Sequence, residues 1–107
     1  MKQYEIRWAN LPAPIGRRPV VLLSRTAAYD YLTRVIVAEV TSTVRGIPQE
    51  VALGRSEGVR DGVVNFDNVH VVPKRLLGDR VGSLAHRAAE VKRALGYALD
   101  WAELKVV

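Results

Sequence analysis

The sequence contains no cysteine, which excludes thiol nucleophiles, disulfides and cysteine-based metal sites. Histidine is also scarce: His70 and His86 are the only two, and no acidic cluster accompanies either of them. Two distant imidazoles make a poor ligand set for a metal ion. We therefore expect chemistry that needs no metal and no other cofactor.

Long apolar runs are absent as well. No stretch approaches the roughly 20 apolar residues of a membrane-spanning helix, and residues 1–8 lack the apolar core of a secretory signal peptide. We therefore expect a cytoplasmic protein that does not enter the membrane.

The chain of 107 residues is long enough for one compact domain, residues 1–107, and for no independent second one. Hydrophobic residues make up 49% of it, which is enough for a packed core. Lys and Arg outnumber Asp and Glu by 16 to 11, and the resulting charge of +5 favours a polyanionic partner such as nucleic acid. A catalytic site on so small a domain would be shallow or shared between subunits.

Short β-type segments dominate the first part of the chain. Bulky side chains alternate along the sequence at Tyr4, Ile6 and Trp8, which is typical of a half-buried strand. By composition and pattern we predict strands over residues 3–11, 18–24, 33–43, 49–53, 63–66, 69–72 and 80–84. Strands this short, with turn residues between them, indicate a small antiparallel sheet or barrel.

Two segments have helical spacing instead. Residues 26–32 predict one or two helical turns over an end of the barrel. Apolar residues repeat at helical spacing over residues 85–99, at Ala88, Val91, Leu95 and Leu99. The predicted fold class is therefore mainly β, with a barrel over residues 1–84 and a C-terminal helix after it.

Five strings of the sequence resemble those of the MazF/PemK toxins and occur at plausible distances in the same order. They are RRPVVLLS at 17–24, VTST at 40–43, RGIPQEV at 45–51, GVVNFDNVHVVPKRL at 62–76 and RVGSL at 80–84. The resemblance implies the SH3-like barrel of the CcdB/MazF/Kid toxins, in a homodimer whose cleft binds single-stranded RNA. It also implies sequence-selective cleavage of that RNA without metal, and a cognate antitoxin as partner.

The same resemblance implies catalytic roles for Arg18, Thr41 and Asp67. Metal-free RNA cleavage needs positive charge beside the phosphorane-like transition state, and a guanidinium fork suits phosphate oxygens. The Thr41 hydroxyl would bond the scissile phosphate, and Asp67 would act as general base or contact RNA. Each residue also has an ordinary interpretation: Arg18 begins a strand, Thr41 is a strand or turn residue, and Asp67 caps a turn between two strands.

Further residues are expected to contact RNA: Arg17, Ser42, Arg45, Asn65, His70 and Arg80. A histidine can act as acid or base near neutrality, although a solvated position on a strand also accounts for His70. Two features depart from the family pattern. Asn65 stands where some members have arginine, and only residues 12–17 join the first two strands, where the family usually has a longer loop that often lines the RNA groove.

Two other functions fit parts of the sequence. A CcdB-like toxin poisons DNA gyrase through apolar and aromatic C-terminal residues, and this chain ends in Trp101, Leu104, Val106 and Val107. A non-catalytic SH3-like binding module would show a groove rich in exposed aromatics, whereas aromatic residues make up only 7% here. The pair of Arg18 and Thr41 favours the ribonuclease.

Overall fold

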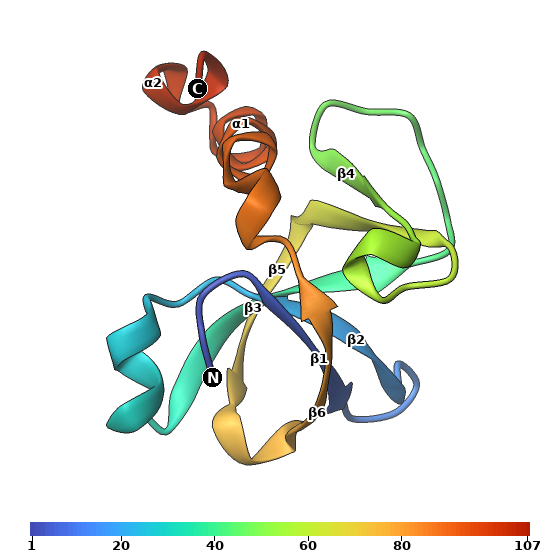
Figure 1. Ribbon diagram of the computed structural model, residues 1–107, viewed down its shortest axis with the longest axis vertical. Helices are drawn as coiled ribbons and strands as arrows, with labels where there is room; N and C mark the ends of the chain where they lie inside the picture. The colour runs from blue at the N-terminus through green and yellow to red at the C-terminus, as the bar shows by residue number, and fades with distance from the viewer.

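Six antiparallel β-strands form one sheet in the order β4-β5-β3-β2-β1-β6 (Figure 1). The strands are β1 (Glu5–Asn10), β2 (Arg17–Leu22), β3 (Arg34–Thr41), β4 (Glu50–Leu53), β5 (Gly62–Pro73) and β6 (Leu77–Ser83). The computed structural model describes all 107 residues. It confirms the predicted fold class, a mainly β protein with a C-terminal helix.

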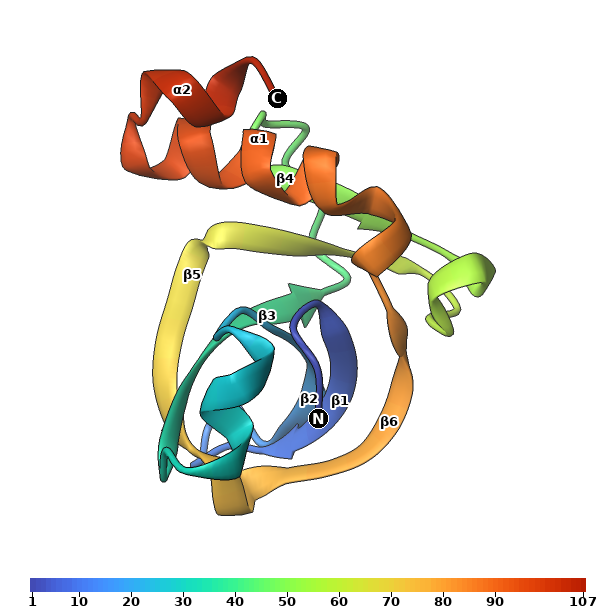
Figure 2. The ribbon, with the colours of Figure 1, turned by 60° about the vertical axis from the view of Figure 1, so that its left-hand side comes forward.

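The sheet curls into an open ring, and helical segments cover two of its sides (Figure 2). The 3₁₀ segment η1 (Thr26–Asp30) lies across one mouth of the ring, where helical turns were predicted. Helix α1 (Ala88–Leu99) packs against β4 and β5, and the short α2 (Ala102–Lys105) packs along α1. None of these helices has the length and apolar character needed to cross a membrane.

The central strands are buried on both faces, which explains why the apolar run RPVVLLS lies in the middle of the sheet. Val20 and Leu22 point to one face and Val21 to the other, and all three are fully buried. On the first face they pack with Tyr29 of η1, and on the second Val21 packs in a cluster with Val91 of α1. We call these two sides the η1 face and the α1 face.

Strand β5 is continuous over 12 residues, whereas the sequence predicted two shorter strands in this region. Its pairing with β3 shifts register between Ala38 and Val40, so residues 65–68 of β5 bulge opposite Glu39. Asp67 and Asn68, a pair of residue types that is common in turns, thus lie at a bend within one strand. The interpretation of Asp67 as the cap of a turn between two strands is wrong.

The C-terminal region also differs in detail from the prediction. A 3₁₀ turn (Ala85–Arg87) precedes α1, and α2 was not predicted because four residues carry no periodicity that a sequence pattern can detect. Leu99, assigned to the apolar face of the helix, is 62% exposed, whereas Ala94 is buried.

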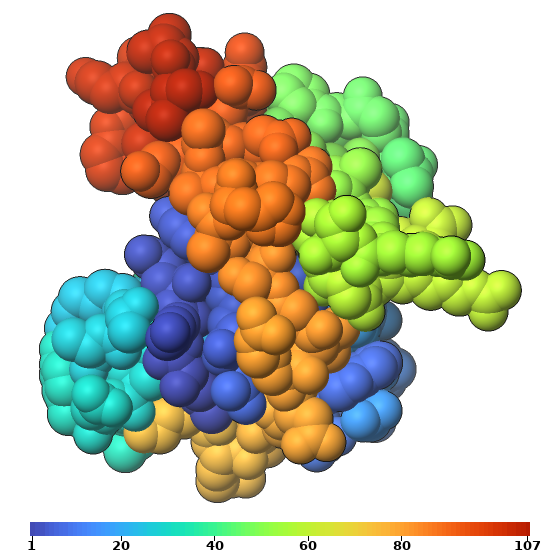
Figure 3. Space-filling model, viewed as in Figure 1, coloured from blue at the N-terminus to red at the C-terminus, as the bar shows by residue number.

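Strand β6 passes very close to the 3₁₀ segment η2 (Arg55–Glu57), between that segment and β1 (Figure 3). A Cβ atom added at Gly82 would lie 1.8 Å from the carbonyl oxygen of Glu57. Gly82→Ala should therefore lower the free energy of unfolding, measured by urea denaturation, by at least about 2 kcal/mol. Gly54→Ala is the control, because a Cβ atom at Gly54 meets no atom within 4 Å. Equal stability of the two variants would contradict the close approach.

Candidate active site

Arg18 and Thr41 lie at the same end of two paired strands and on the same face of the sheet. In the register of β2 with β3, Val20 pairs with Glu39. Arg18 precedes Val20 by two positions and Thr41 follows Glu39 by two, so both side chains point to the η1 face. The structure thus brings together two of the three residues that were predicted to be catalytic.

A buried glutamate, Glu39, holds Arg18 in place and joins it to His70. Arg18 donates a hydrogen bond from Nη1 to Oε1 of Glu39 at 2.9 Å, and His70 Nε2 contacts the other oxygen, Oε2. The side chain of Glu39 is 9% exposed, against 34% for Arg18 and 43% for His70. A carboxylate at this depth needs cationic or hydrogen-bonding partners, so Glu39 fixes two side chains that themselves stay open to solvent.

Glu39 is not among the site residues expected from the sequence. It stands in the run VIVAEV, whose β-branched residues predict a strand but do not say which of its positions are buried. Glu39 has the same parity as Val35 and Val37, which are buried on the η1 face. A carboxylate on the buried side of a strand needs a partner of opposite charge, and this parity is the signal that would have found it.

Thr41 ends β3 and shapes the loop that follows. Its Oγ1 accepts a hydrogen bond from the backbone amide of Thr43 at 3.1 Å. This bond is the turn interaction that the ordinary interpretation of Thr41 describes. It leaves the hydroxyl hydrogen available to another acceptor, so the turn and a contact with phosphate are compatible.

The loop of residues 42–49 carries Ser42 and Arg45, both exposed. Glu50, the first residue of β4, closes this loop. Its carboxylate accepts hydrogen bonds from the backbone amides of Arg45, at 3.1 Å to Oε2, and of Gly46, at 2.9 Å to Oε1. Ser42 and Arg45 are therefore presented next to Thr41 by a loop whose backbone is tied to the sheet.

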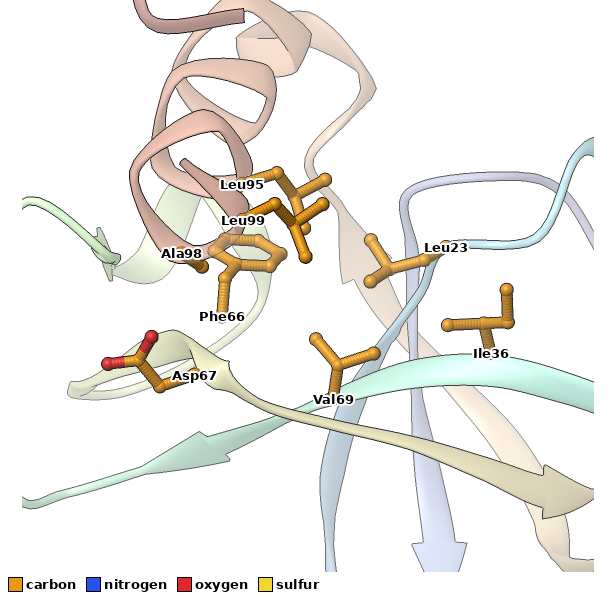
Figure 4. Close-up of a pocket in the computed structure, with 8 residues that line it drawn as sticks. All are labelled: Leu23, Ile36, Phe66, Asp67, Val69, Leu95, Ala98 and Leu99. Atoms are coloured by element: carbon orange, nitrogen blue, oxygen red, sulfur yellow. The ribbon is translucent and has the colours of Figure 1, made fainter. Parts of the chain in front are cut away.

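Asn65 and Asp67 lie at the bend of β5 and face different surroundings. Asn65 is buried, and its Oδ1 accepts a hydrogen bond from the backbone amide of Asp67 at 2.9 Å. The Asp67 carboxylate lies at the rim of an apolar hollow on the α1 face and points away from the apolar side chains (Figure 4). Within one chain, therefore, the structure does not bring Asp67 together with Arg18 and Thr41.

Arg17 and Arg80 do not belong to this group. Arg17 is adjacent to Arg18 in β2, so its side chain points to the opposite face of the sheet, and Arg80 lies on β6, two strands from β2. The guanidinium carbon of Arg17 is 4.0 Å from the centroid of the Trp8 ring, a cation–π contact. Arg80 on β6 places Nε 3.3 Å from Oε2 of Glu5. Burial alone would raise the pKa of Glu5, but the hydrogen bond and charge of Arg7 hold that pKa below its ordinary value. Arg17 and Arg80, two of the three arginines predicted to bind RNA, are both exposed.

The side chains on the η1 face can act on a phosphate. A fixed guanidinium can stabilise negative charge, an imidazole can transfer a proton, and a hydroxyl can bond a phosphate oxygen. No three side chains of histidine, aspartate or glutamate converge in the structure in the arrangement of a metal site.

Comparison with known proteins identifies the class. The family of PemK-like, MazF-like toxins of type II toxin–antitoxin systems matches residues 2–99. The probable endoribonuclease MazF5 of Mycobacterium tuberculosis is 43% identical over 99 residues, which covers 90% of each chain. The endoribonuclease MazF3 of the same organism is 39% identical over 88 residues, which covers 78% of this chain and 85% of that one.

Solved structures agree with this result. Toxin MazF-mt6 of Mycobacterium tuberculosis has a TM-score of 0.82 and 36% identity, covering 90% of this chain and 96% of that one. An endoribonuclease in complex with its cognate antitoxin, from a mycobacterial species, has a TM-score of 0.82 and 27% identity, covering 94% and 96%. The chain therefore belongs to the family of PemK-like, MazF-like toxins of type II toxin–antitoxin systems, and its fold is that of the MazF toxins.

Proposed function

We propose that this protein is a sequence-selective endoribonuclease that cleaves single-stranded RNA without metal. The observation that carries the proposal is the position of Arg18, which a buried carboxylate holds at the exposed end of the sheet where Thr41 also lies. The relatives named as endoribonucleases support it. The charge of +5 also suits an RNA backbone.

The proposed reaction uses the nucleophile that RNA itself supplies. The 2′-oxygen attacks the adjacent phosphorus, the P–O2′ bond forms and the P–O5′ bond breaks, which leaves a 2′,3′-cyclic phosphate and a 5′-hydroxyl. Negative charge accumulates on the phosphate oxygens, where Arg18 contributes about 3 kcal/mol of stabilisation, as one preorganised donor does. Thr41 donates its hydroxyl hydrogen to one of the same oxygens.

The flanking nucleotides are proposed to contact the residues around this pair. Ser42 and Arg45 stand on the tied loop after Thr41, where they can reach phosphates and base edges. Arg17, on the other face of β2, and Arg80, on β6, are proposed to contact the RNA backbone farther from this pair. Asn65 is buried at the bend of β5, so we assign it to shaping the site.

A homodimer is proposed because the α1 face presents an apolar hollow. It is lined by Leu23, Ile36, Phe66, Asp67, Val69, Leu95, Ala98 and Leu99 (Figure 4). Contiguous exposed apolar residues on so small a domain mark an interface, and a specific pair buries about 800 Å² per partner. Asp67 lies at the rim of this surface, so in such a dimer its carboxylate lies beside the second copy, and we propose that it contacts RNA there and not at Arg18.

A cognate antitoxin is the other proposed partner, because one structural neighbour was solved with its own antitoxin. An acidic antitoxin segment would complement the charge of +5 and compete with RNA for Arg18. Because toxin, antitoxin and RNA must meet in one compartment, we propose that the protein acts in the cytoplasm.

The purified protein should cleave a long single-stranded RNA in the presence of EDTA and leave 2′,3′-cyclic phosphate ends. The physical reason is that Arg18 provides the positive charge and the 2′-hydroxyl provides the nucleophile. Gel electrophoresis measures the cleavage, and mass spectrometry of the fragments identifies their ends. Strict dependence on added magnesium would defeat the metal-free mechanism, and inhibition of gyrase without RNA cleavage would favour the CcdB-like alternative.

Arg18→Lys should lower kcat for RNA cleavage by at least about tenfold, because an ammonium lacks the planar fork that contacts two phosphate oxygens at once. Lysine retains the charge opposite the buried Glu39, so the thermal melt should stay close to that of the wild type. Arg55→Lys, at an exposed arginine outside the site, is the matched control. Full activity of Arg18→Lys would remove Arg18 from the mechanism.

Light scattering should report a particle of about twice 11.9 kDa for the wild type, and a monomer for Val69→Lys. A lysine at Val69 would place a charge in the apolar surface that the second copy covers. Ile15→Lys is the matched control, since Ile15 is 38% exposed and Val69 is 40% exposed, but Ile15 lies in the turn between β1 and β2. If both variants remain dimeric, the interface lies elsewhere.

A further inference from the structure

We propose that His70 is the general acid of the RNA cleavage reaction and that Glu39 is the residue that positions it. This inference rests on the function proposed above. It names the group that protonates the departing 5′-oxygen, a role that neither Arg18 nor Thr41 fills.

The His70 ring is fixed through one nitrogen and open at the other. Nε2 contacts Oε2 of Glu39, and no hydrogen bond of the structure engages Nδ1. The side chain is 43% exposed, so a substrate can reach the ring. A carboxylate that fixes one imidazole nitrogen orients the other toward the reacting group, as in the Ser-His-Asp arrangement of hydrolases.

His70 is also on the correct side of the sheet. It pairs with Val37 in the register of β5 with β3, and Val37, Glu39 and Thr41 alternate along β3 toward one face. Glu39 on β3, and Arg18 on β2 through Glu39, are the charged groups that face the imidazole. A phosphate bound by Arg18 is therefore bound beside the group that holds His70.

Among the side chains of the candidate site, no other is suited to give up a proton at neutral pH. A guanidinium stays protonated, and a threonine hydroxyl does not ionise in this range. Both oxygens of Glu39 are engaged by Arg18 and His70. Asp67 lies at the hollow on the α1 face. Histidine is the residue type that commonly transfers protons near neutrality.

The proton balance of the step is complete. The 2′-hydroxyl gives its proton to a water molecule as the P–O2′ bond forms. The imidazolium of His70 gives the proton on Nδ1 to O5′ as the P–O5′ bond breaks. The neutral imidazole then regains a proton from solvent, and Glu39 keeps its contact with Nε2 throughout.

A substrate that needs no acid tests this role directly. In an RNA whose scissile 5′-oxygen is replaced by sulfur, the leaving group is a thiolate, which departs without protonation. His70→Gln should lower cleavage of the oxygen substrate about a hundredfold, in the range for general acid catalysis. The same variant should cleave the sulfur substrate within about threefold of the wild type, whereas Arg18→Lys should be impaired on both substrates.

The chain offers a matched control in a second histidine–glutamate pair. His86 Nε2 lies 3.1 Å from Oε2 of Glu57, outside the site, and its side chain is 53% exposed. His86→Gln should cleave both substrates within about twofold of the wild type. An equal loss on both substrates for His70→Gln would overturn the general-acid role. Failure of the wild type to cleave any RNA would instead overturn the proposed function itself.

Glu39 is tested by the same comparison. Glu39→Gln keeps the shape of the side chain but removes the charge that holds the imidazolium. It should lower cleavage of the oxygen substrate more than cleavage of the sulfur substrate, because part of its effect passes through His70. A loss that is identical on the two substrates would limit Glu39 to a structural role and contradict its part of the proposal.

Discussion

The buried carboxylate of Glu39 is the constraint on which the organisation of the site depends. Burying a carboxylate until only 9% of its side chain is exposed costs free energy unless polar partners contact it, and Arg18 and His70 contact it from two different strands. Without a partner, both of these side chains would populate several rotamers in solvent. Their shared partner therefore reduces the conformational entropy that a substrate would otherwise have to remove on binding.

The bend of β5 determines which side chains reach this carboxylate. The register of β5 against β3 shifts opposite Glu39, so the chain passes His70 to the η1 face and leaves Asp67 beside the hollow on the α1 face. The oxygen of the buried Asn65 side chain holds that bend through the backbone amide of Asp67. The bulge reverses the alternation of side chains along β5, so it decides that His70 and not Asp67 shares a face with Glu39.

The sequence was sufficient to predict a strand and its place in the sheet where burial follows from composition. Val20, Val21 and Leu22 predict a central strand because a run of apolar residues is stable only where both faces are covered. It was not sufficient for β5, where an Asp-Asn pair resembles a turn and only the pairing with β3 reveals a bulge. Glu39 was missed for a related reason: composition indicates a strand, whereas the partners of a charged residue depend on which strands lie beside it.

What a group of charged side chains can do therefore depends on where it lies in the fold, and not on its residue types alone. Glu57 is also buried, and it contacts His86 at 3.1 Å and Arg87 at 3.3 Å, the same two residue types that contact Glu39. That second group lies beside the start of α1, where Arg87 donates a hydrogen bond to the backbone of β4 and helps to attach the helix to the sheet. The group around Glu39 instead shares the exposed end of β2 and β3 with a hydroxyl and a tied loop. Similar ion pairs stabilise the fold in one place and can act on a phosphate in the other, because only the group around Glu39 has a hydroxyl and a tied loop beside it.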